Sequence, residues 1–382
     1  MPNQATPIGI FVCGDVMTGR GIDQALPHPG NAVLYETYVR DAREYVRLAA
    51  RVNGPIAPPV DFPYIWGDAL GELQGVGTDV KIINLETGIT TSEDAWPGKG
   101  IHYRMRPWNI GCLTAARIDC CCLANNHVLD WGYAGLIETL QTLDRAGIAR
   151  AGAGENVAEA ASPAALDVPG KGRVLVFSMG STTGGIPGEW GATRDRPGVN
   201  LLEDLSEETA RRVASQIREA KRPGDVTVAS IHWGGNWGYD IPDEQIRFAH
   251  RLVEEGVDIV HGHSSHHVKA IEVYRDRLIL YGCGDFLDDY EGISGYEAFR
   301  DDLRLMYLVR VEPQQGRLGE VRLVPMQVRR FRLNRASEAD ASWLCDLLNR
   351  LGAPFGTQVQ LEGDNSMILR VGPDSAGRME KR

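Results

Sequence analysis

Short apolar runs recur along this chain, and each run ends abruptly in a glycine or a polar residue. Segments with helical periodicity lie between them; Tyr133–Ala146, for example, carries Leu136, Leu140 and Leu143 on one face. Runs of this length are typical of buried strands, and buried strands that alternate with helices indicate an α/β fold. The runs interpreted as strands are Ile8–Val12, Val80–Ile83, Ile118–Leu123, Val174–Ser178, Val226–Ile231, Ile259–His261 and Leu278–Tyr281.

Further helices are expected at Ser206–Ala220 and Asp243–Glu255. Ser206 lies at the position of an N-cap and is followed by two glutamates, which favour the positive end of a helix. The proline-rich stretch Asn53–Pro63 is interpreted as an irregular loop or an insertion rather than a linker between domains.

The character of the chain changes after about residue 335. Ser337 is expected to cap a helix that runs to about Leu351, with Asp340 completing a capping box. A hairpin of Gln358–Gly363 and Met367–Val371 is expected to follow it. We therefore divide the 382 residues into a main domain, 1–335, and a small C-terminal α+β appendage, 336–382.

The charge balance argues against nucleic acid as a partner. The chain has 40 Lys+Arg against 51 Asp+Glu, a formal net charge of -11, whereas affinity for nucleic acid rests largely on neutralised phosphates. The apolar run Ile8–Cys13 is too short for a signal sequence and no stretch approaches a membrane span, so we expect no membrane anchor. Seven cysteines, three of them consecutive at 120–122, fit buried thiols in a reducing cytoplasm better than a disulfide framework.

Six of the predicted strands end next to residues that can bind a metal ion or transfer a proton. In an open α/β sheet the site lies at the carboxyl ends of the strands, so these residues are expected to meet. A single Gly-Asp after a strand is more often a plain turn, and it is the recurrence that predicts a site. The residues are Asp15, Glu86, Asn126 with His127, His232, the histidines of His261–His267, and Asp285.

Each of these residues has a plain structural alternative. Asp15 could cap a turn, Glu86 could be a solvated loop carboxylate, and His232 could be a core histidine with satisfied hydrogen bonds. Asp130 could simply be the N-cap of the helix that follows it. The His261–His267 cluster is harder to explain this way, because it holds four of the nine histidines of the chain.

Five short segments are specific in their combination and order, although none is specific alone. They are Gly14-Asp15-Val16-Met17 with Gly19-Arg20, Asn84-Leu85-Glu86, Ala124-Asn125-Asn126-His127 with Asp130 and Gly132, His232-Trp233-Gly234, and Gly262-His263-Ser264-Ser265-His266. In these segments the chain resembles the CapA family of poly-γ-glutamate synthesis proteins, within the calcineurin-like metallophosphoesterase superfamily. The match runs from about residue 8 to 330. It implies a four-layer αββα sandwich, in which helices flank two β-sheets.

The resemblance also implies a role for each matching residue at a pair of metal ions bridged by a carboxylate. Asp15 looks like a ligand of the first ion, and Glu86 takes the bridging place that aspartate usually holds. Asn126 would bind the second ion through its amide oxygen. His127 resembles the histidine that contacts the leaving group and so is not a ligand. Imidazole ligands would come from His232, His263 and His266.

Two features depart from the family pattern. Met17 stands where the histidine of an Asp-X-His motif is expected, so one ligand is missing. Two residues separate His263 from His266, where one is usual. This spacing leaves open which of four histidines bind, and we include His261 in the predicted ligand set; the four are His261, His263, His266 and His267.

Divalent cations in such a site can lower the pKa of a bridging water and stabilise the oxygens of an in-line displacement. Mixed nitrogen and oxygen ligands suit Mn, Fe or Zn, and we expect one or two ions per chain. His127 would donate a proton to the departing group, and Asp130 of the same segment is grouped with it. Arg20, five residues after Asp15, is expected to hold an anionic substrate by bidentate contacts.

Two functions are compatible with this pattern. The first is a metal-dependent hydrolase that acts on a phosphoester or on a γ-glutamyl or other amide, in a small molecule or a polymer. The second is a non-catalytic or accessory role in the biosynthesis of a glutamate-containing polymer or metabolite. A thiol enzyme that uses Cys283 is disfavoured, because the sequence fixes no base beside this residue.

Overall fold

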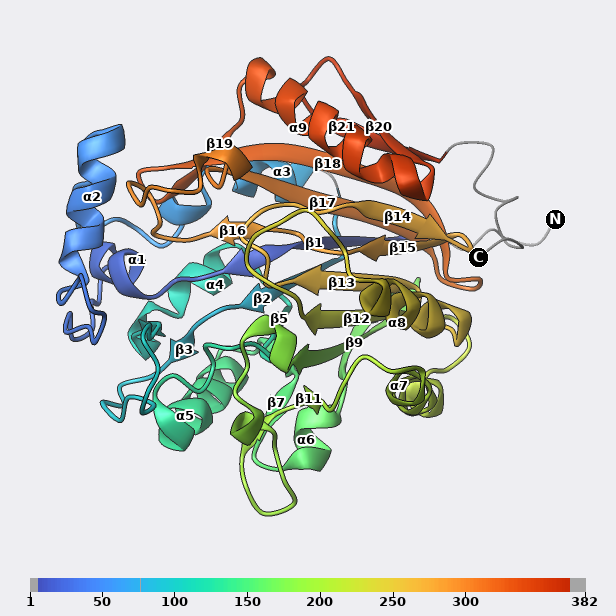
Figure 1. Ribbon diagram of the computed structural model, residues 1–382, viewed down its shortest axis with the longest axis horizontal. Helices are drawn as coiled ribbons and strands as arrows, with labels where there is room; N and C mark the ends of the chain where they lie inside the picture. Colours follow the sequence, from blue (N-terminus) through green and yellow to red (C-terminus); the bar gives the residue numbers. More distant parts are fainter. Residues whose placement is uncertain (1–5, 76, 372–382) are drawn as a thin grey trace.

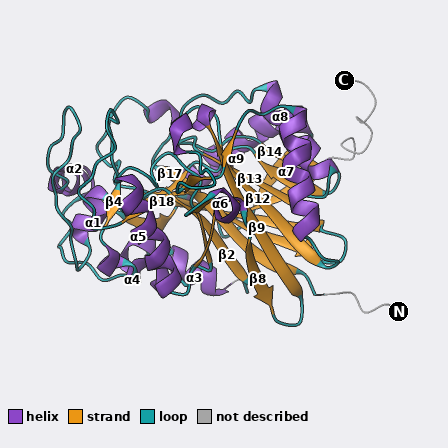
Figure 2. Ribbon diagram, turned by 90° about the horizontal axis from the view of Figure 1, so that it is seen from below, coloured by secondary structure: helices purple, strands orange, loops and turns teal. Residues whose placement is uncertain are grey.

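Two β-sheets lie face to face, and helices cover the outer faces of both (Figure 1). The structure is a computed structural model, and it describes residues 6–75 and 77–371. Figure 2 shows the strands in the middle, with α4 and α5 on one side and α7 and α8 on the other. The chain therefore has the α/β class and the four-layer αββα arrangement that the resemblance implies.

The first sheet has ten strands in the order β20-β21-β18-β17-β1-β2-β5-β6, with β16 beside β1 and β19 beside β18. Neighbours β1, β2, β5 and β6 are parallel, and β16 is parallel to β1. The strands are β1 (Ile8–Val16), β2 (Val80–Leu85), β5 (Cys120–Cys122), β6 (Ala149–Ala151), β16 (Asp285–Leu287), β17 (Leu303–Glu312), β18 (Arg317–Arg329), β19 (Arg332–Arg335), β20 (Thr357–Leu361) and β21 (Met367–Val371).

The second sheet has seven strands in the order β11-β9-β12-β13-β15-β14, with β8 beside β9. Strands β9, β12, β13 and β15 are parallel neighbours. The strands are β8 (Ala164–Val168), β9 (Gly172–Ser181), β11 (Leu201–Leu202), β12 (Asp225–His232), β13 (Ile259–His263), β14 (Ile271–Tyr274) and β15 (Arg277–Leu280); two short pairs lie outside the sheets, β3 (Gly88–Ile89) with β4 (Arg104–Met105) and β7 (Ala153–Gly154) with β10 (Gly198–Val199).

Nine α-helices occur in the described residues, and they begin and end as follows: α1 (Arg20–Ala25), α2 (Arg43–Asn53), α3 (Ala69–Gly75), α4 (Gly111–Ala115), α5 (Gly132–Arg145), α6 (Val157–Ala161), α7 (Glu207–Ala220), α8 (Asp243–Glu254) and α9 (Glu338–Gly352). No helix within residues 6–75 and 77–371 is both long and apolar enough to cross a membrane.

Burial on both faces explains why the predicted strands are continuous apolar runs. In β1, Ile10 and Val12 belong to the core between the two sheets, while Phe11 and Cys13 belong to the core under the outer helices. The three consecutive cysteines of β5 alternate in the same way, and all three are buried free thiols, as predicted.

Every strand and helix predicted from the sequence is present, and several are longer than predicted. Strand β1 continues to Val16, which places Asp15 inside the strand rather than after it. The long pair β17 and β18 is outside the predicted set, because β18 contains Pro325 and β17 contains Arg304, and both residue types argue against a central buried strand. Burial of Arg304 is possible because its guanidinium pairs with Asp288.

The C-terminal helix and hairpin are continuous with the sandwich. The Ser337 hydroxyl accepts the Asp340 backbone N–H at 3.2 Å and donates to the Asp340 carboxylate at 2.6 Å, so the predicted N-cap is confirmed. Strand β21 pairs with β18, and the α9 residues Leu344 and Leu348 lie in the core between the sheets. Residues 336–371 therefore extend the first sheet; residues 372–382 of the predicted appendage lie outside the described residues.

Candidate metal centre

The strand-end residues of the first sheet meet at one edge of the sandwich. Asp15 near the end of β1 pairs in register with Asn84 on β2 and with Asp285. The prediction that Asp285 follows the end of the Leu278–Tyr281 strand is wrong, because Asp285 begins β16, a separate strand of the first sheet. Glu86 follows β2 directly and is 5% exposed, although a loop position would leave a carboxylate in solvent. The parallel arrangement brings these groups together because adjacent parallel strands end on the same side.

The second sheet contributes histidines from β12 and β13. His232 pairs in register with His263, and Ser230 pairs with His261. Side chains two residues apart on a strand point to the same face, so these four side chains share one face of the sheet. They lie opposite the end of β1, and the His261 ring reaches the Cys13 carbonyl oxygen of that strand at 2.7 Å.

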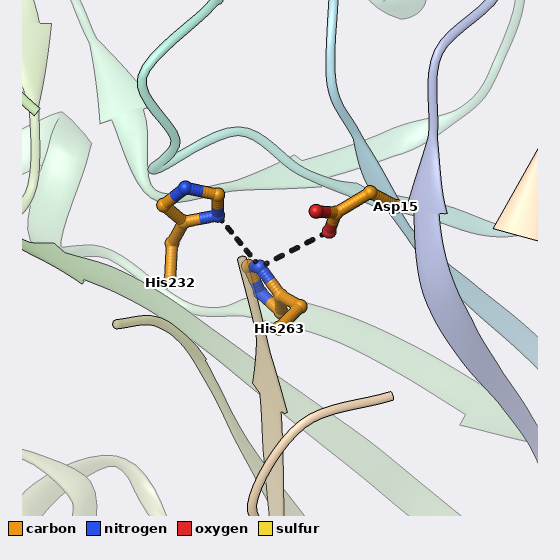
Figure 3. A group of neighbouring side chains, drawn as sticks. All are labelled: Asp15, His232 and His263. Atoms are coloured by element: carbon orange, nitrogen blue, oxygen red, sulfur yellow. Dashed lines mark hydrogen bonds and ion pairs between the residues drawn. The ribbon is translucent and has the colours of Figure 1, made fainter. Parts of the chain in front are cut away.

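His232, His263 and Asp15 form the closest group (Figure 3). The Nδ1 atoms of the two histidines are 3.0 Å apart, and His263 Nδ1 is 3.6 Å from Asp15 Oδ1. None of the three is more than 2% exposed. In the described part of the chain, no other three His, Cys, Asp or Glu residues bring potential ligand atoms within 4.8 Å of one another.

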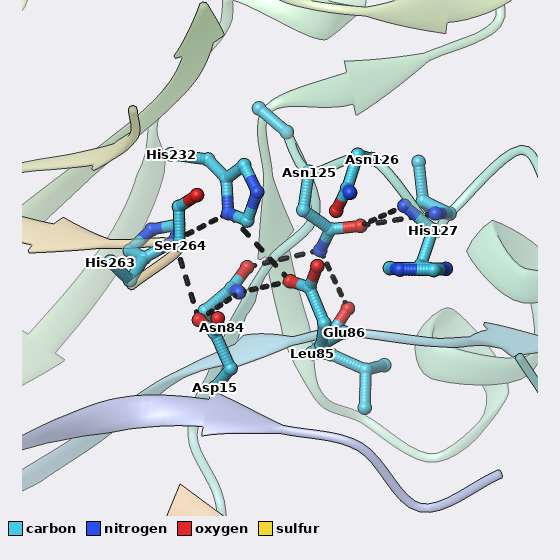
Figure 4. Close-up of polar contacts among 12 residues, drawn as sticks. Asp15, Asn84, Leu85, Glu86, Asn125, Asn126, His127, His232, His263 and Ser264 are labelled. Atoms are coloured by element: carbon cyan, nitrogen blue, oxygen red, sulfur yellow. Dashed lines mark hydrogen bonds and ion pairs between the residues drawn. The ribbon is translucent and has the colours of Figure 1, made fainter. Parts of the chain in front are cut away.

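Glu86 faces the same nitrogen of His232 as His263 does, with Oε2 at 3.7 Å from Nδ1 (Figure 4). Asn84 orients both carboxylates, because its amide donates to Asp15 Oδ1 at 2.7 Å and also to Glu86 Oε2. Asn125 fixes Asn84 in turn, since its amide donates to Asn84 Oδ1 at 3.0 Å. The two carboxylates are thus held in place from behind by a pair of asparagines.

Asn126 brings an amide oxygen that has no hydrogen-bond partner among the described residues. This Oδ1 is buried. A buried polar atom without a partner costs about 1–3 kcal/mol, so such atoms call for an explanation. Placed beside histidines and carboxylates, the unpaired acceptor fits a metal ligand, the role that the resemblance implies for Asn126.

The hydrogen bonds behind His263 fix which ring nitrogen carries a proton. A carbonyl oxygen only accepts, so His261 Nε2 donates to Cys13 and His261 Nδ1 accepts. Ser230 Oγ is 3.1 Å from His261 Nδ1 and 2.9 Å from His263 Nε2. The single hydroxyl hydrogen of Ser230 is donated to His261 Nδ1, because that nitrogen accepts. His263 Nε2–H then donates to Ser230, which leaves the lone pair of His263 Nδ1 facing Asp15 and His232. This is the arrangement that metal-bound histidines have.

His127 stands beside this group and is paired with Asp130. Its Nδ1 is 2.6 Å from Asp130 Oδ2, and its ring stacks on Tyr103 at 3.9 Å between centroids. The Lys99 ammonium forms an ion pair with the same carboxylate and lies 3.1 Å from His127 Nδ1. Burial lowers the pKa of His127 to about 4, against the opposing effect of Asp130, so the ring is neutral at neutral pH.

The other three histidines of the cluster point in different directions. His266 Nδ1 lies 3.0 Å from both carboxylate oxygens of Asp285. His267 Nδ1 donates to the Val268 carbonyl at 3.0 Å, and its ring stacks on Phe299. His261 faces the Cys13 carbonyl and Ser230, so both of its ring nitrogens are engaged away from the carboxylates. Only His263 and His266 face carboxylates of the site.

Arg20 lies outside the metal-binding group. It is 4% exposed, its guanidinium contacts Asp289 and Glu36, and it stacks over the Tyr45 ring at 3.9 Å from the centroid. Two buried carboxylates already take its donors, so this geometry does not support the predicted bidentate contact with an anionic substrate. Cys283 is also buried, and burial raises its pKa well above the usual range, which argues against a nucleophilic thiolate.

The electrostatics of the group favour a bound cation. Burial, together with Glu86 and Asp285, raises the pKa of Asp15 well above its usual value. Burial also raises the pKa of Glu86, and burial with the nearby His127 lowers the pKa of His232 to about 3. The carboxylates thus lack a compensating positive charge, and the imidazoles are neutral and able to act as ligands. This mixture of nitrogen and oxygen donors fits Mn, Fe or Zn.

Residues 9–290 match the model of the family described as "Bacterial capsule synthesis protein PGA_cap". The chain belongs to this family. The matched range contains every residue of the site described above, and the resemblance to the CapA group drawn from five short segments is confirmed.

Curated relatives agree with this assignment. The chain is 48% identical over 367 residues to a "Probable polyglutamine synthesis accessory protein" of Mycobacterium tuberculosis, covering 96% of both chains. It is 28% identical to the "Capsule biosynthesis protein CapA" of Bacillus anthracis, over 56% of this chain and 49% of that one. A 5'-nucleotidase precursor from Thermus thermophilus is a distant structural likeness, with 11% identity, a TM-score of 0.46 and coverage of 91% of this chain and 59% of that one.

Several residues of the site are absent from the predicted ligand and catalytic sets, among them Ser230, Asp285 and Lys99. Ser230 could have been found by placing the two strands in register, because it lies two residues before His232 and opposite His261. The sequence predicts Asp285 after the Leu278–Tyr281 strand, and no local pattern indicates that Asp285 begins a further strand beside β1. Lys99 lies in an irregular loop, and no sequence signal links it to Asp130.

Proposed function

We propose that this protein is a metal-dependent hydrolase that serves as an accessory protein in the synthesis of a glutamate-containing polymer. The observation that carries the hydrolase proposal is the buried group of Asp15, Glu86, His232 and His263 beside the unpaired amide oxygen of Asn126. The names of the relatives support the polymer setting, since they refer to polyglutamine synthesis and capsule biosynthesis.

In this proposal the group of five residues just named holds a divalent cation, with His266 as a further ligand. Once bound, the cation supplies Lewis-acid activation of a water molecule and of the oxygen at the scissile bond. Asn84 and Asn125 keep the carboxylates in position, and Ser230 with His261 keeps His263 Nδ1 unprotonated. Ordered neighbours of this kind are what a preorganised metal site requires.

His127 is the proposed proton donor to the leaving group. Its Nδ1–H is held by Asp130 and the ring is neutral, so Nε2 first takes a proton from the attacking water and then passes it to the leaving group. The Asp130 carboxylate stabilises the protonated ring, as in other carboxylate–histidine pairs. Tyr103 holds the ring plane by stacking, and its backbone N–H donates to Asp130 at 2.7 Å. The proposed substrate is a phosphoester or a γ-glutamyl amide.

A second function is favoured by a separate observation. The relative that covers 96% of this chain is named as an accessory protein. In this alternative the same residues bind a cation and a glutamate-containing chain without hydrolysing it. Both functions require the metal group, whereas only hydrolysis requires His127.

His127→Ala separates the two functions. We expect unchanged metal content and a loss of turnover of about 10²–10⁴-fold, the usual contribution of general acid–base catalysis. The measurements are elemental analysis of the purified protein and hydrolysis of bis-p-nitrophenyl phosphate and γ-glutamyl-p-nitroanilide with added Mn²⁺ or Zn²⁺.

His250→Ala is the matched control, because His250 is also paired with a carboxylate, that of Glu272, but lies outside the site. It should leave both metal content and turnover unchanged. Bound metal without turnover in the natural protein would support the accessory alternative. Absence of bound metal in every preparation would rule out the hydrolase.

A further inference from the structure

The irregular loop between β3 and β4 wraps around one residue, Asp130. The Trp96 backbone N–H donates to the Asp130 carbonyl oxygen at 2.8 Å. The Tyr103 backbone N–H donates to Asp130 Oδ2 at 2.7 Å, and the Lys99 ammonium donates to Oδ1. Asp130 is 0% exposed, and within residues 6–75 and 77–371 no lysine or arginine other than Lys99 pairs with it. The loop therefore supplies both the orientation and the positive charge that this buried carboxylate needs.

The two oxygens of the Asp130 carboxylate have different partners. Oδ2 lies 2.6 Å from His127 Nδ1, and because an ionised carboxylate only accepts, Nδ1 carries the hydrogen of this bond. Among the described residues, Oδ1 accepts from Lys99 alone. Lys99 lies 3.1 Å from His127 Nδ1 without bonding to it, because that nitrogen has no free lone pair. The carboxylate thus links the lysine to the imidazole.

We propose that Lys99 is a positioning residue that acts on His127 through Asp130, keeping the carboxylate ionised and Oδ2 turned toward Nδ1. The inference rests on the proposed function, in which His127 takes a proton from water and passes it to the leaving group. An ionised carboxylate in a fixed orientation stabilises the protonated ring between these two steps. Without Lys99, the buried Asp130 has no compensating cation, and its charge and orientation are no longer fixed.

The loop is built to turn Lys99 inward. Gly98 and Gly100, on either side of it, are exposed, and Gly98 has a φ of +76°, a conformation that favours glycine. The Trp96 ring packs edge-on against Trp190 at 5.4 Å between centroids, and the Lys99 ammonium lies 5.2 Å from the centroid of the same Trp190 ring. As a result, the Lys99 side chain is only 16% exposed although it comes from a surface turn.

The contacts of Lys99 favour this role over direct binding of an anionic substrate. Its ammonium donates to Asp130 Oδ1 and to the Asn126 carbonyl oxygen, and the Trp190 ring lies beside it. A substrate ligand would contribute to KM, whereas a residue that orients the proton carrier contributes to kcat alone. The two roles of Lys99 are therefore separable by steady-state kinetics.

Lys99→Met tests the inference on the full-length, metal-loaded protein. We expect unchanged metal content, an unchanged KM for bis-p-nitrophenyl phosphate and a kcat lower by about 10–100-fold, the usual effect of losing such a neighbouring residue. Proton NMR of the ¹⁵N-histidine-labelled protein gives a readout that needs no turnover. The His127 Nδ1–H signal, identified by its absence in His127→Ala, should be present in the natural protein and lost in Lys99→Met. Lys99→Arg keeps the charge and should recover most of both the signal and kcat.

Lys221→Met is the matched control. Lys221 also pairs with a buried carboxylate, that of Asp258, and also donates to a backbone carbonyl, that of Gly256 at 2.8 Å, but it lies outside the site. Its replacement should change neither kcat nor the His127 signal.

The other outcomes contradict the proposal. A raised KM with unchanged kcat in Lys99→Met would make Lys99 a substrate ligand, and lost metal would place its effect on Asn126. A raised kcat would show that repulsion between Lys99 and the protonated ring outweighs its effect on Asp130. Unchanged kcat with an intact Nδ1–H signal would leave Lys99 a purely structural residue.

Failure of the proposed function gives a different result. If the natural protein hydrolyses nothing, the hydrolase is ruled out, and the NMR signal alone decides about Lys99: its loss in Lys99→Met supports the link through Asp130, and its persistence overturns it. If Lys99→Met does not fold, Lys99→Gln provides the same test, because its amide still donates to Oδ1 but carries no charge. Natural values of kcat and of the signal in Lys99→Gln would contradict the need for a cation.

Discussion

Two buried polar groups lie close together in this protein and differ in one respect. The Arg20 group comprises Arg20, Glu36, Tyr45 and Asp289, and each of its carboxylates has a cationic partner within the chain, since one guanidinium contacts both. In the metal-binding group around His232 and His263, carboxylates face neutral imidazoles and an amide oxygen stays unpaired. The comparison indicates that a complete buried network stabilises the fold, whereas an incomplete one marks the place for a ligand.

The largest expected effect comes from Asp15→Asn. Because Asp15 lies in the metal-binding group and beside Asp285, losing its charge should remove bound metal and reduce any hydrolysis by about 10⁴-fold, which corresponds to several kcal/mol of transition-state stabilisation. The free energy of unfolding of the metal-free protein should not fall, since one buried uncompensated charge disappears. Elemental analysis, a turnover assay and urea unfolding of the metal-free protein check this. Full metal content in the variant would contradict the assignment.

Arg20→Met should show the opposite pattern. Its removal leaves Asp289 and Glu36 buried without a cation, which costs about 3–5 kcal/mol of stability. The folded fraction should still bind as much metal per chain as the natural protein. Thermal and urea unfolding measure the first quantity, and elemental analysis of the folded protein measures the second. A stable Arg20→Met with impaired substrate binding would instead restore the original prediction of a contact with an anionic substrate.

A smaller effect is expected from Ser230→Ala. The hydroxyl fixes the proton of His263 on Nε2, and loss of such a neighbour lowers metal affinity by about 10–100-fold. Titration of the metal-free variant with Mn²⁺ or Zn²⁺ gives the dissociation constant directly. Ser178→Ala is a suitable control, because Ser178 is buried on the adjacent strand β9 but bonds to the backbone of Ala124. Equal metal affinity in Ser230→Ala and the natural protein would show that the hydrogen bond between His263 and Ser230 does not contribute to metal binding.

Much of the fold follows from the pattern of short apolar runs. The predicted strands and helices occur because their residues are buried on both faces or along one stripe, and these periodicities are local properties of the sequence. The pair β17 and β18 escaped prediction because Arg304 and Pro325 are tolerated there only through contacts made elsewhere, such as the pairing of Arg304 with Asp288. A local sequence pattern does not show which distant residue will compensate a buried charge.

The sequence by itself determined the class of the fold, the family and the set of polar residues at the strand ends, because strand-end positions and short motifs are local. Only the tertiary structure decided how these residues divide. In the folded protein His232 and His263 lie beside Asp15, and Asp285 lies beside Asp15 on the adjacent strand. Arg20 forms ion pairs with Asp289 and Glu36, and the His261 ring contacts the Cys13 carbonyl oxygen. The physical reason is that the charge and hydrogen-bond partners of a buried group come from distant segments of the chain, and sheet register selects them.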